Sequence, residues 1–191
     1  FLRIVMQAGL VLLGAGWLAS AAPQVPGSTP IAGAVVRTDQ VRAELLAHAP
    51  GGLAPGRQAW LGLRLDHAPG WHSYWKNPGD SGLPTTLEWV LPPGFQVGEI
   101  AWPTPRPLPL GTLVNYGYEG RLLLAVPLQV PAGFAGDSVP VRLRAQWLVC
   151  KDVCIPEEGE FALELPGRAA ITATAADFEA ARAALPRPVP G

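Results

Sequence analysis

Short segments in which apolar and polar residues alternate recur along the chain from Val35 onward. The clearest of them place an apolar residue at every second position of 61–65, 87–91, 122–128 and 139–149. Successive side chains of a β-strand point to opposite faces, so each segment predicts a strand with one buried face. Proline and glycine separate the segments, and this spacing is typical of an antiparallel sandwich. We therefore predict an all-β fold.

The two ends of the chain have a different pattern. Residues 1–22 combine Arg3, an apolar run and the small residues of a cleavage site, which predicts a signal peptide. At about fifteen residues, the apolar run is shorter than the roughly 20 that span a bilayer. Residues 23–33 predict a flexible leader, and 34–170 the sandwich domain. Within 171–191 we expect a short helix that Thr174 caps, followed by a linker to a further, transmembrane region.

Composition narrows the function. The net charge of −1 leaves no basic surface for phosphates, which excludes nucleic acid as a partner. The 22 prolines and 22 glycines indicate many turns rather than disorder, because seven tryptophans and abundant leucine and valine can still fill a core. An exported protein enters an oxidising compartment, where a pair of cysteines can persist as a disulfide.

The chain has two cysteines, Cys150 and Cys154, with three residues between them. A disulfide between them would close a loop of five residues and add roughly 2 kcal/mol of stability, against about 4.7 kcal/mol for a loop of 100 residues. A structural disulfide and a metal site both remain alternatives, although the three histidines lack the spacing of metal ligands. The sequence favours a redox-active dithiol. Lys151 would favour a thiolate and Asp152 would oppose it, so the pattern leaves the thiol pKa open.

Strand parity places Cys150 on the polar face of its strand, together with Arg142 and Arg144, so we expect it to be at least partly accessible. After the tip, the chain returns through a second alternating run at 161–165. Residues directly opposite in a hairpin have Cβ atoms roughly 4.5–5.5 Å apart, slightly more than the roughly 3.5–4.5 Å of a disulfide. Cys150 and Cys154 can therefore bridge after a small adjustment.

Two other segments carry candidate chemistry. The segment 79–82, with the sequence GDSG, matches the nucleophile motif of trypsin-like proteases, but Leu83 follows where a further glycine would be needed. We interpret it as a polar loop. The aromatic segment 71–76 predicts a strand with alternate residues in the core, and exposed aromatics that stack on sugar are the alternative. His72 and Tyr74 share one face of this strand, where they could flank the cysteine pair.

Two stretches resemble one family. GWHSYWKNPGDSGLPTTLEW and QWLVCKDVCIPEEGEFALELP are similar to the N-terminal periplasmic domain of the thiol:disulfide interchange protein DsbD family, and to its ScsB-like branch in particular. The similarity covers roughly residues 35–190. It implies an immunoglobulin-like antiparallel β-sandwich with a short C-terminal helix. Five residues separate the cysteines in the best-known members, but three do here.

The resemblance also implies a function. A membrane-embedded reductase domain of the same chain would reduce the Cys150/Cys154 pair, which would then reduce periplasmic thioredoxin-fold proteins by thiol–disulfide exchange. The resemblance suggests Cys154 as the cysteine that forms the mixed disulfide. His72 and Tyr74 would be active-site neighbours. Residues 105–113 would form a cap loop, with Leu108 and Leu110 as shields. No cofactor or metal would be needed.

Two rival functions remain at this stage. One is an extracytoplasmic sandwich that binds carbohydrate or protein and has a purely structural disulfide. The other is a periplasmic metal-handling module.

Overall fold

The computed structural model describes residues 33–187, so the predicted signal peptide and most of the predicted leader lie outside it. Eleven strands and one helix make up the described part. Every pair of neighbouring strands in the two sheets is antiparallel. No helix of the described residues is long and apolar enough to cross a membrane.

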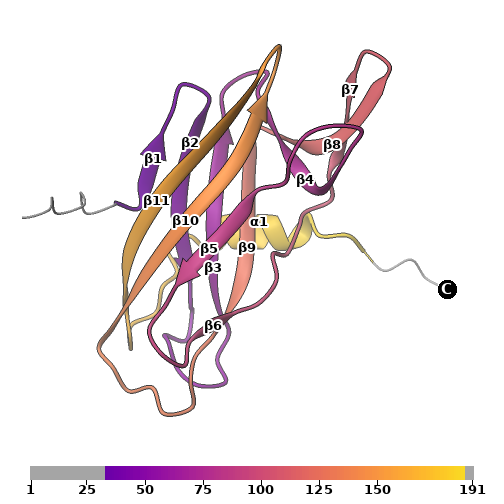
Figure 1. The fold of residues 1–191 in the computed structure, drawn as a ribbon. Helices are drawn as coiled ribbons and strands as arrows, with labels where there is room; N and C mark the ends of the chain where they lie inside the picture. Colours follow the sequence, from indigo (N-terminus) through magenta and orange to yellow (C-terminus); the bar gives the residue numbers. More distant parts are fainter. Residues whose placement is uncertain (1–32, 188–191) are drawn as a thin grey trace, which may run out of the picture. The chain divides into compact units, whose positions relative to one another are not determined.

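The first sheet has five strands (Figure 1). In spatial order they are β1 (Val35–Arg37), β2 (Val41–His48), β3 (Ala59–His67), β9 (Arg121–Gln129) and β6 (Gln96–Val97). The second sheet contains β11 (Cys154–Pro166), β10 (Ser138–Cys150), β4 (His72–Gly79), β8 (Leu113–Glu119) and β7 (Arg106–Leu110), with β5 (Thr86–Val90) also paired to β10. This arrangement confirms the predicted immunoglobulin-like antiparallel sandwich.

The alternating runs supply the core between the two sheets. Leu61, Leu63 and Leu65 of β3 are fully buried, and so is every second residue of β10 from Val139 to Val149. The predicted inward faces of these two strands are therefore correct. Trp71, directly before β4, and Trp75 of β4 also pack against this core, which fits the interpretation of segment 71–76 as a core strand.

Helix α1 (Ala175–Ala183) lies against the first sheet, where Phe178 and Ala181 form a small second cluster with Leu46, Leu123 and Ala125. Thr174 precedes the helix as predicted, but its side chain does not cap it. Instead, the Thr174 hydroxyl donates to the Ala47 carbonyl at 2.5 Å, so it joins the start of the helix to β2. The capping prediction is wrong because the hydroxyl has a tertiary partner.

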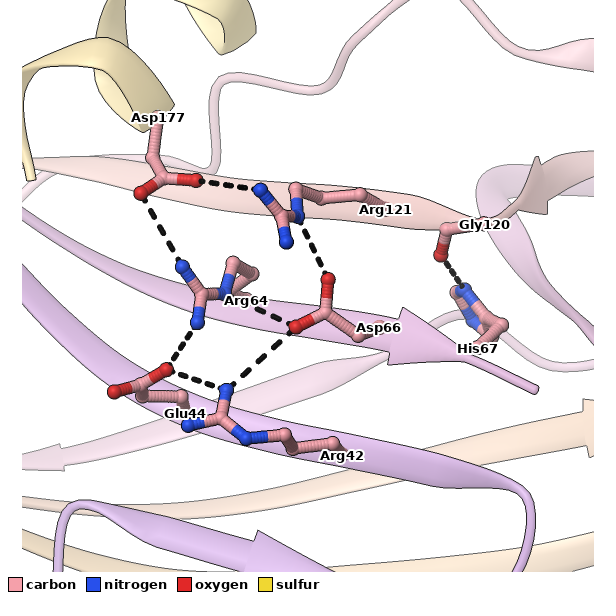
Figure 2. Close-up of polar contacts among 8 residues, drawn as sticks. All are labelled: Arg42, Glu44, Arg64, Asp66, His67, Gly120, Arg121 and Asp177. Carbon is pink, nitrogen blue, oxygen red and sulfur yellow. Dashed lines mark hydrogen bonds and ion pairs between the residues drawn. The ribbon is translucent and has the colours of Figure 1, made fainter.

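A network of charged side chains covers the outer face of the first sheet (Figure 2). Its members are three arginines and three carboxylates from β2, β3, β9 and α1, namely Arg42, Glu44, Arg64, Asp66, Arg121 and Asp177. Arg64 lies at the centre, with ion pairs to Glu44, Asp66 and Asp177. It therefore connects the helix to two strands of the sheet.

Candidate functional site

The two cysteines form a disulfide at the tip of the β10–β11 hairpin, with their sulfurs 2.00 Å and their Cα atoms 4.1 Å apart. The hairpin is in register from Ser138 and Pro166 to this tip, where Cys150 stands directly opposite Cys154. In the turn, the Lys151 N–H donates to the Val153 carbonyl at 3.1 Å. The prediction that the cysteines stand opposite each other is confirmed.

The two cysteines differ in exposure. Cys154 is exposed, whereas Cys150 is only 3% exposed. The expectation that Cys150 is accessible is wrong. Parity identifies the face of β10 correctly, but at this end of the strand Cys150 lies between two others, paired with Cys154 on one side and with His72 of β4 on the other. Of the two cysteines, Cys154 is the one open to solvent.

His72 and Tyr74 lie beside the disulfide on one face of β4, as predicted. Their rings meet edge to face with centroids 5.3 Å apart, and His72 Nε2 is 3.4 Å from the Tyr74 hydroxyl. The same hydroxyl is 3.8 Å from Cys154 Sγ. The structure thus brings four of the predicted site residues together.

Burial shifts the pKa values of His72 and Tyr74. It lowers the pKa of His72, with a smaller opposing effect from the charge of Glu119. It raises the pKa of Tyr74. At neutral pH, His72 is therefore a neutral imidazole and Tyr74 a protonated phenol that can donate to a sulfur. The site offers polar groups without a fixed charge on either ring.

The opposite face of β4 is anchored to the first sheet by a hydrogen bond between the half-buried His67 and the buried Ser73. His67 Nδ1 donates to the Gly120 carbonyl at 2.7 Å, so Nε2 accepts from the fully buried Ser73 hydroxyl at 2.9 Å. Burial lowers the pKa of His67 and keeps the ring neutral. This contact fixes β4 immediately between His72 and Tyr74.

Lys151 and Asp152 are both exposed in the turn that joins the cysteines. The Lys151 side chain lies against the β3–β4 turn, because a Cβ at Gly70 would be 3.1 Å from Lys151 Cε. Among the described residues, neither side chain forms an ion pair. Their proposed effect on the thiols stays a prediction.

The predicted cap region forms the β7–β8 hairpin rather than an irregular loop. Leu108 is half-buried, stands opposite Asn115, and packs near Gly117, which pairs with Tyr74. The backbone of Leu110 is opposite Leu113, and its side chain lies outside the described part. Whether Leu108 and Leu110 shield the cysteines stays a prediction.

Sequence reasoning missed the contribution of the segment that follows β4. Residues 79–84 form a loop that folds against Tyr74, which is only 1% exposed. Pro84 bridges to Tyr74, and Gly82 lies on its ring. The signal was present in the glycines of the GDSG motif, since Gly79 and Gly82 both have positive φ angles. Interpreting this motif only as a polar loop gave no reason to connect it with the cysteines.

The structure also bears on metal binding. Within residues 33–187, no group of three or more His, Cys, Asp or Glu side chains is placed to hold a metal ion.

Comparisons with known proteins agree with this geometry. The profile of the family described as "Thiol:disulfide interchange protein DsbD, N-terminal" matches residues 43–166. The solved N-terminal periplasmic domain of ScsB from Proteus mirabilis shares the fold, with a TM-score of 0.59 and 20% identity over 81% of this chain. The match covers 59% of that chain's length. No curated protein sequence matches. Because the family profile spans more than half of this chain and includes both cysteines, the chain belongs to the family of DsbD N-terminal domains.

Proposed function

We propose that this domain is a periplasmic thiol–disulfide exchange module that reduces thioredoxin-fold proteins through Cys150 and Cys154. The observation that carries the proposal is the unequal exposure of a directly paired disulfide: Cys154 is open to a partner, and Cys150 is buried beside it. An attacking thiol must be accessible, whereas the thiol that resolves a mixed disulfide needs only to reach its neighbour. The hairpin tip meets both requirements.

The first step uses the reduced form of the domain. The Cys154 thiolate attacks one sulfur of the partner's disulfide, so a Cys154–partner bond forms and the partner's other sulfur leaves as a thiolate. The Cys150 thiolate then attacks Cys154 Sγ. The intramolecular disulfide forms, the partner's second sulfur leaves, and the partner takes up two protons. Two electrons have passed from the domain to the partner.

The domain returns to its reduced form by the reverse chemistry with a dithiol donor. We propose that the donor is a membrane-embedded reductase domain of the same protein. Its first thiolate would attack the exposed Cys154 Sγ and release Cys150 as the leaving thiolate. Its second thiolate would then attack the donor sulfur of this mixed disulfide, which releases Cys154 and leaves the donor with a disulfide. The disulfide itself carries the electrons, so the proposed cycle needs no cofactor.

The surroundings of Cys154 support a protein as the partner. Val153, directly before it, is 62% exposed and offers an apolar contact at the hairpin tip. An exposed apolar residue beside the reactive sulfur can be covered only while a partner is docked. We propose that Val153 contributes to this encounter.

Trapping tests the proposal. Cys150→Ser retains the exposed thiol but lacks the resolving one, so it should accumulate a mixed disulfide with an oxidised thioredoxin-fold protein on a non-reducing gel. Cys154→Ser is the matched control, and its buried thiol should trap at least tenfold less. Equal trapping by both variants would overturn the assignment of Cys154 as the attacking residue.

A second measurement separates exchange from a purely structural bond. The reduction potential of the pair in the unmutated protein should lie above about −300 mV, the value below which structural disulfides resist reduction. A lower potential together with no trapping by either variant would instead establish a binding sandwich with a structural disulfide.

A further inference from the structure

The segment between β4 and β5 folds against Tyr74. The β4 strand pairs with β8 at Tyr74, leaves the register, and pairs with it again where Gly79 meets Asn115. Residues 79–84 then return over the Tyr74 ring to the bridge with Pro84. The irregular pairing and the loop together enclose the Tyr74 side chain, whose hydroxyl contacts Cys154.

Asn115 attaches this loop to β8. It is 1% exposed, and its Oδ1 accepts from the Ser81 N–H at 2.9 Å and from the Ser81 hydroxyl at 3.1 Å. Its Nδ2 donates back to Ser81 Oγ at 3.0 Å. A buried amide with three such bonds to one residue holds that residue in a single position, because an unpaired polar group there would be costly.

Asp80 adds a second attachment one residue earlier. Its backbone N–H donates to the Val114 carbonyl at 3.2 Å, and its Oδ2 accepts from the Val114 N–H at 2.7 Å. Asp80 is therefore bound to Val114 of β8, and Ser81 to the next residue of that strand, Asn115. The loop has little freedom to move away from the strand.

Gly82 transmits this position to the tyrosine. It has a φ of +97°, and a Cβ there would lie 2.4 Å from Tyr74 Cε1 and 2.7 Å from Cζ. The glycine backbone consequently rests directly on the ring. Only glycine allows both this conformation and this approach.

We propose that Ser81 and Asn115 are positioning residues of the exchange reaction: they clamp the 79–84 loop so that Gly82 fixes the Tyr74 ring, and the Tyr74 hydroxyl stabilises the Cys154 thiolate. The proposal rests on the proposed function, in which Cys154 is the attacking sulfur. In the oxidised form the hydroxyl is already 3.8 Å from Cys154 Sγ. Once the sulfur carries a negative charge, the hydroxyl donates to it in a stronger, charge-assisted bond.

Few charged groups compete with this effect. The titratable groups named above are His72 and Tyr74 from β4, Glu119 from β8, whose charge acts on His72, and Lys151 and Asp152 in the turn. His72 is neutral, and the turn contributes one charge of each sign. The Tyr74 hydroxyl is thus the group that stabilises the Cys154 thiolate.

The test measures the acidity of Cys154 in the Cys150→Ser background, from the pH dependence of its alkylation by iodoacetamide. Gly82→Ala should raise the Cys154 pKa by about one unit, which is a tenfold loss of thiolate below that pKa. Ser81→Ala, which is milder for the fold, should raise it in the same direction by a smaller amount. Gly94→Ala is the matched control, because Gly94 also has a positive φ (+86°) but contacts Pro131. It should lose stability and leave the Cys154 pKa unchanged.

A double-mutant cycle separates positioning from general loosening. In the Tyr74→Phe background the hydroxyl is already absent, so Gly82→Ala should then leave the Cys154 pKa unchanged. An equal rise with and without the Tyr74 hydroxyl would overturn the proposal, as would unchanged pKa values in both loop variants. Those results would leave the proposed exchange intact if Cys150→Ser still traps a partner. Conversely, failure to trap would overturn the exchange function whatever the pKa values are.

Discussion

The outer face of the first sheet carries charged side chains, whereas the polar side chains beside the disulfide on the second sheet are neutral. On the first sheet, six charged side chains are paired with one another across three strands and the helix (Figure 2). On the second sheet, the disulfide is surrounded by a neutral histidine and a protonated tyrosine. Charges that are already paired stabilise a fold, whereas neutral donors are available to a charge that develops during a reaction. The domain thus separates its stability from its reactivity.

The largest effect should follow from removing the exposed sulfur. We expect Cys154→Ser to abolish disulfide exchange with thioredoxin-fold proteins, because Cys150 is too buried to attack. The free energy of unfolding should fall by only about 2 kcal/mol, since the lost bond closes a loop of five residues. Reduction of the unmutated protein by dithiothreitol should cost the same amount in urea denaturation. A much larger loss would mean that the bond has a structural role.

Removing Arg64, the centre of the charged network, should lower stability and leave disulfide exchange unchanged. The Arg64 side chain is only 14% exposed and has three carboxylate partners, so Arg64→Ala leaves each of these partly buried carboxylates with fewer arginine partners, only Arg42, Arg121 or both. We expect the free energy of unfolding to fall by about 2–3 kcal/mol in urea denaturation. The rate of disulfide exchange in native buffer should stay unchanged. A slower rate would show that the two sheet faces are coupled.

The next effect concerns His67, which lies between the two regions. It follows Asp66 of the network and is bonded to Ser73 of the site strand. Burial lowers its pKa in the folded protein, so the unfolded chain binds the proton more readily. Stability should be complete above the unfolded pKa of about 6.5 and should fall as the pH drops below it, with a slope of up to about 1.4 kcal/mol per pH unit.

The variant His67→Gln tests this assignment. The free energy of unfolding, measured from pH 7 to pH 5.5, should depend less steeply on pH in the variant than in the unmutated protein. His72→Gln is the control for the other histidine whose pKa is lowered by burial. An unaltered slope in His67→Gln would contradict a neutral His67 whose pKa is lowered in the folded protein.

The smallest effect is expected at the edge of the network. Arg121 pairs with Asp66 and Asp177, but its side chain is 65% exposed. Exposed ion pairs contribute little and are screened by salt. Arg121→Ala should therefore lower stability by about 0.5 kcal/mol or less, and added salt should remove the difference. A cost similar to that of Arg64→Ala would contradict the ranking by burial.

Periodicity predicted the parts of the fold that depend on one buried face. The alternation along β3 and β10 identified their inward residues, and the two runs around the cysteines identified a hairpin with the thiols opposite each other. These features follow from the geometry of a single strand or strand pair. His72 and Tyr74 were placed on one face by the same rule.

The remaining features depend on segments that are distant in sequence. Parity could not show that β4 lies beside Cys150, since this pairing joins residues far apart in the chain. Nor could a favourable capping residue reveal that Ala47 would accept from Thr174 instead. The loop over Tyr74 escaped prediction because its partner, Asn115, follows it by more than thirty residues. Tertiary contacts overrode local preference in each case.

The long register of the β10–β11 hairpin has a consequence for how the domain signals its redox state. The disulfide joins the last pair of a ladder in which both strands have 13 residues. Opening it should therefore leave the backbone nearly unchanged and expose no unpaired strand edge to aggregation. A partner must then distinguish the oxidised form from the reduced form by the chemistry of one sulfur, because the outline of the docking surface hardly differs between them.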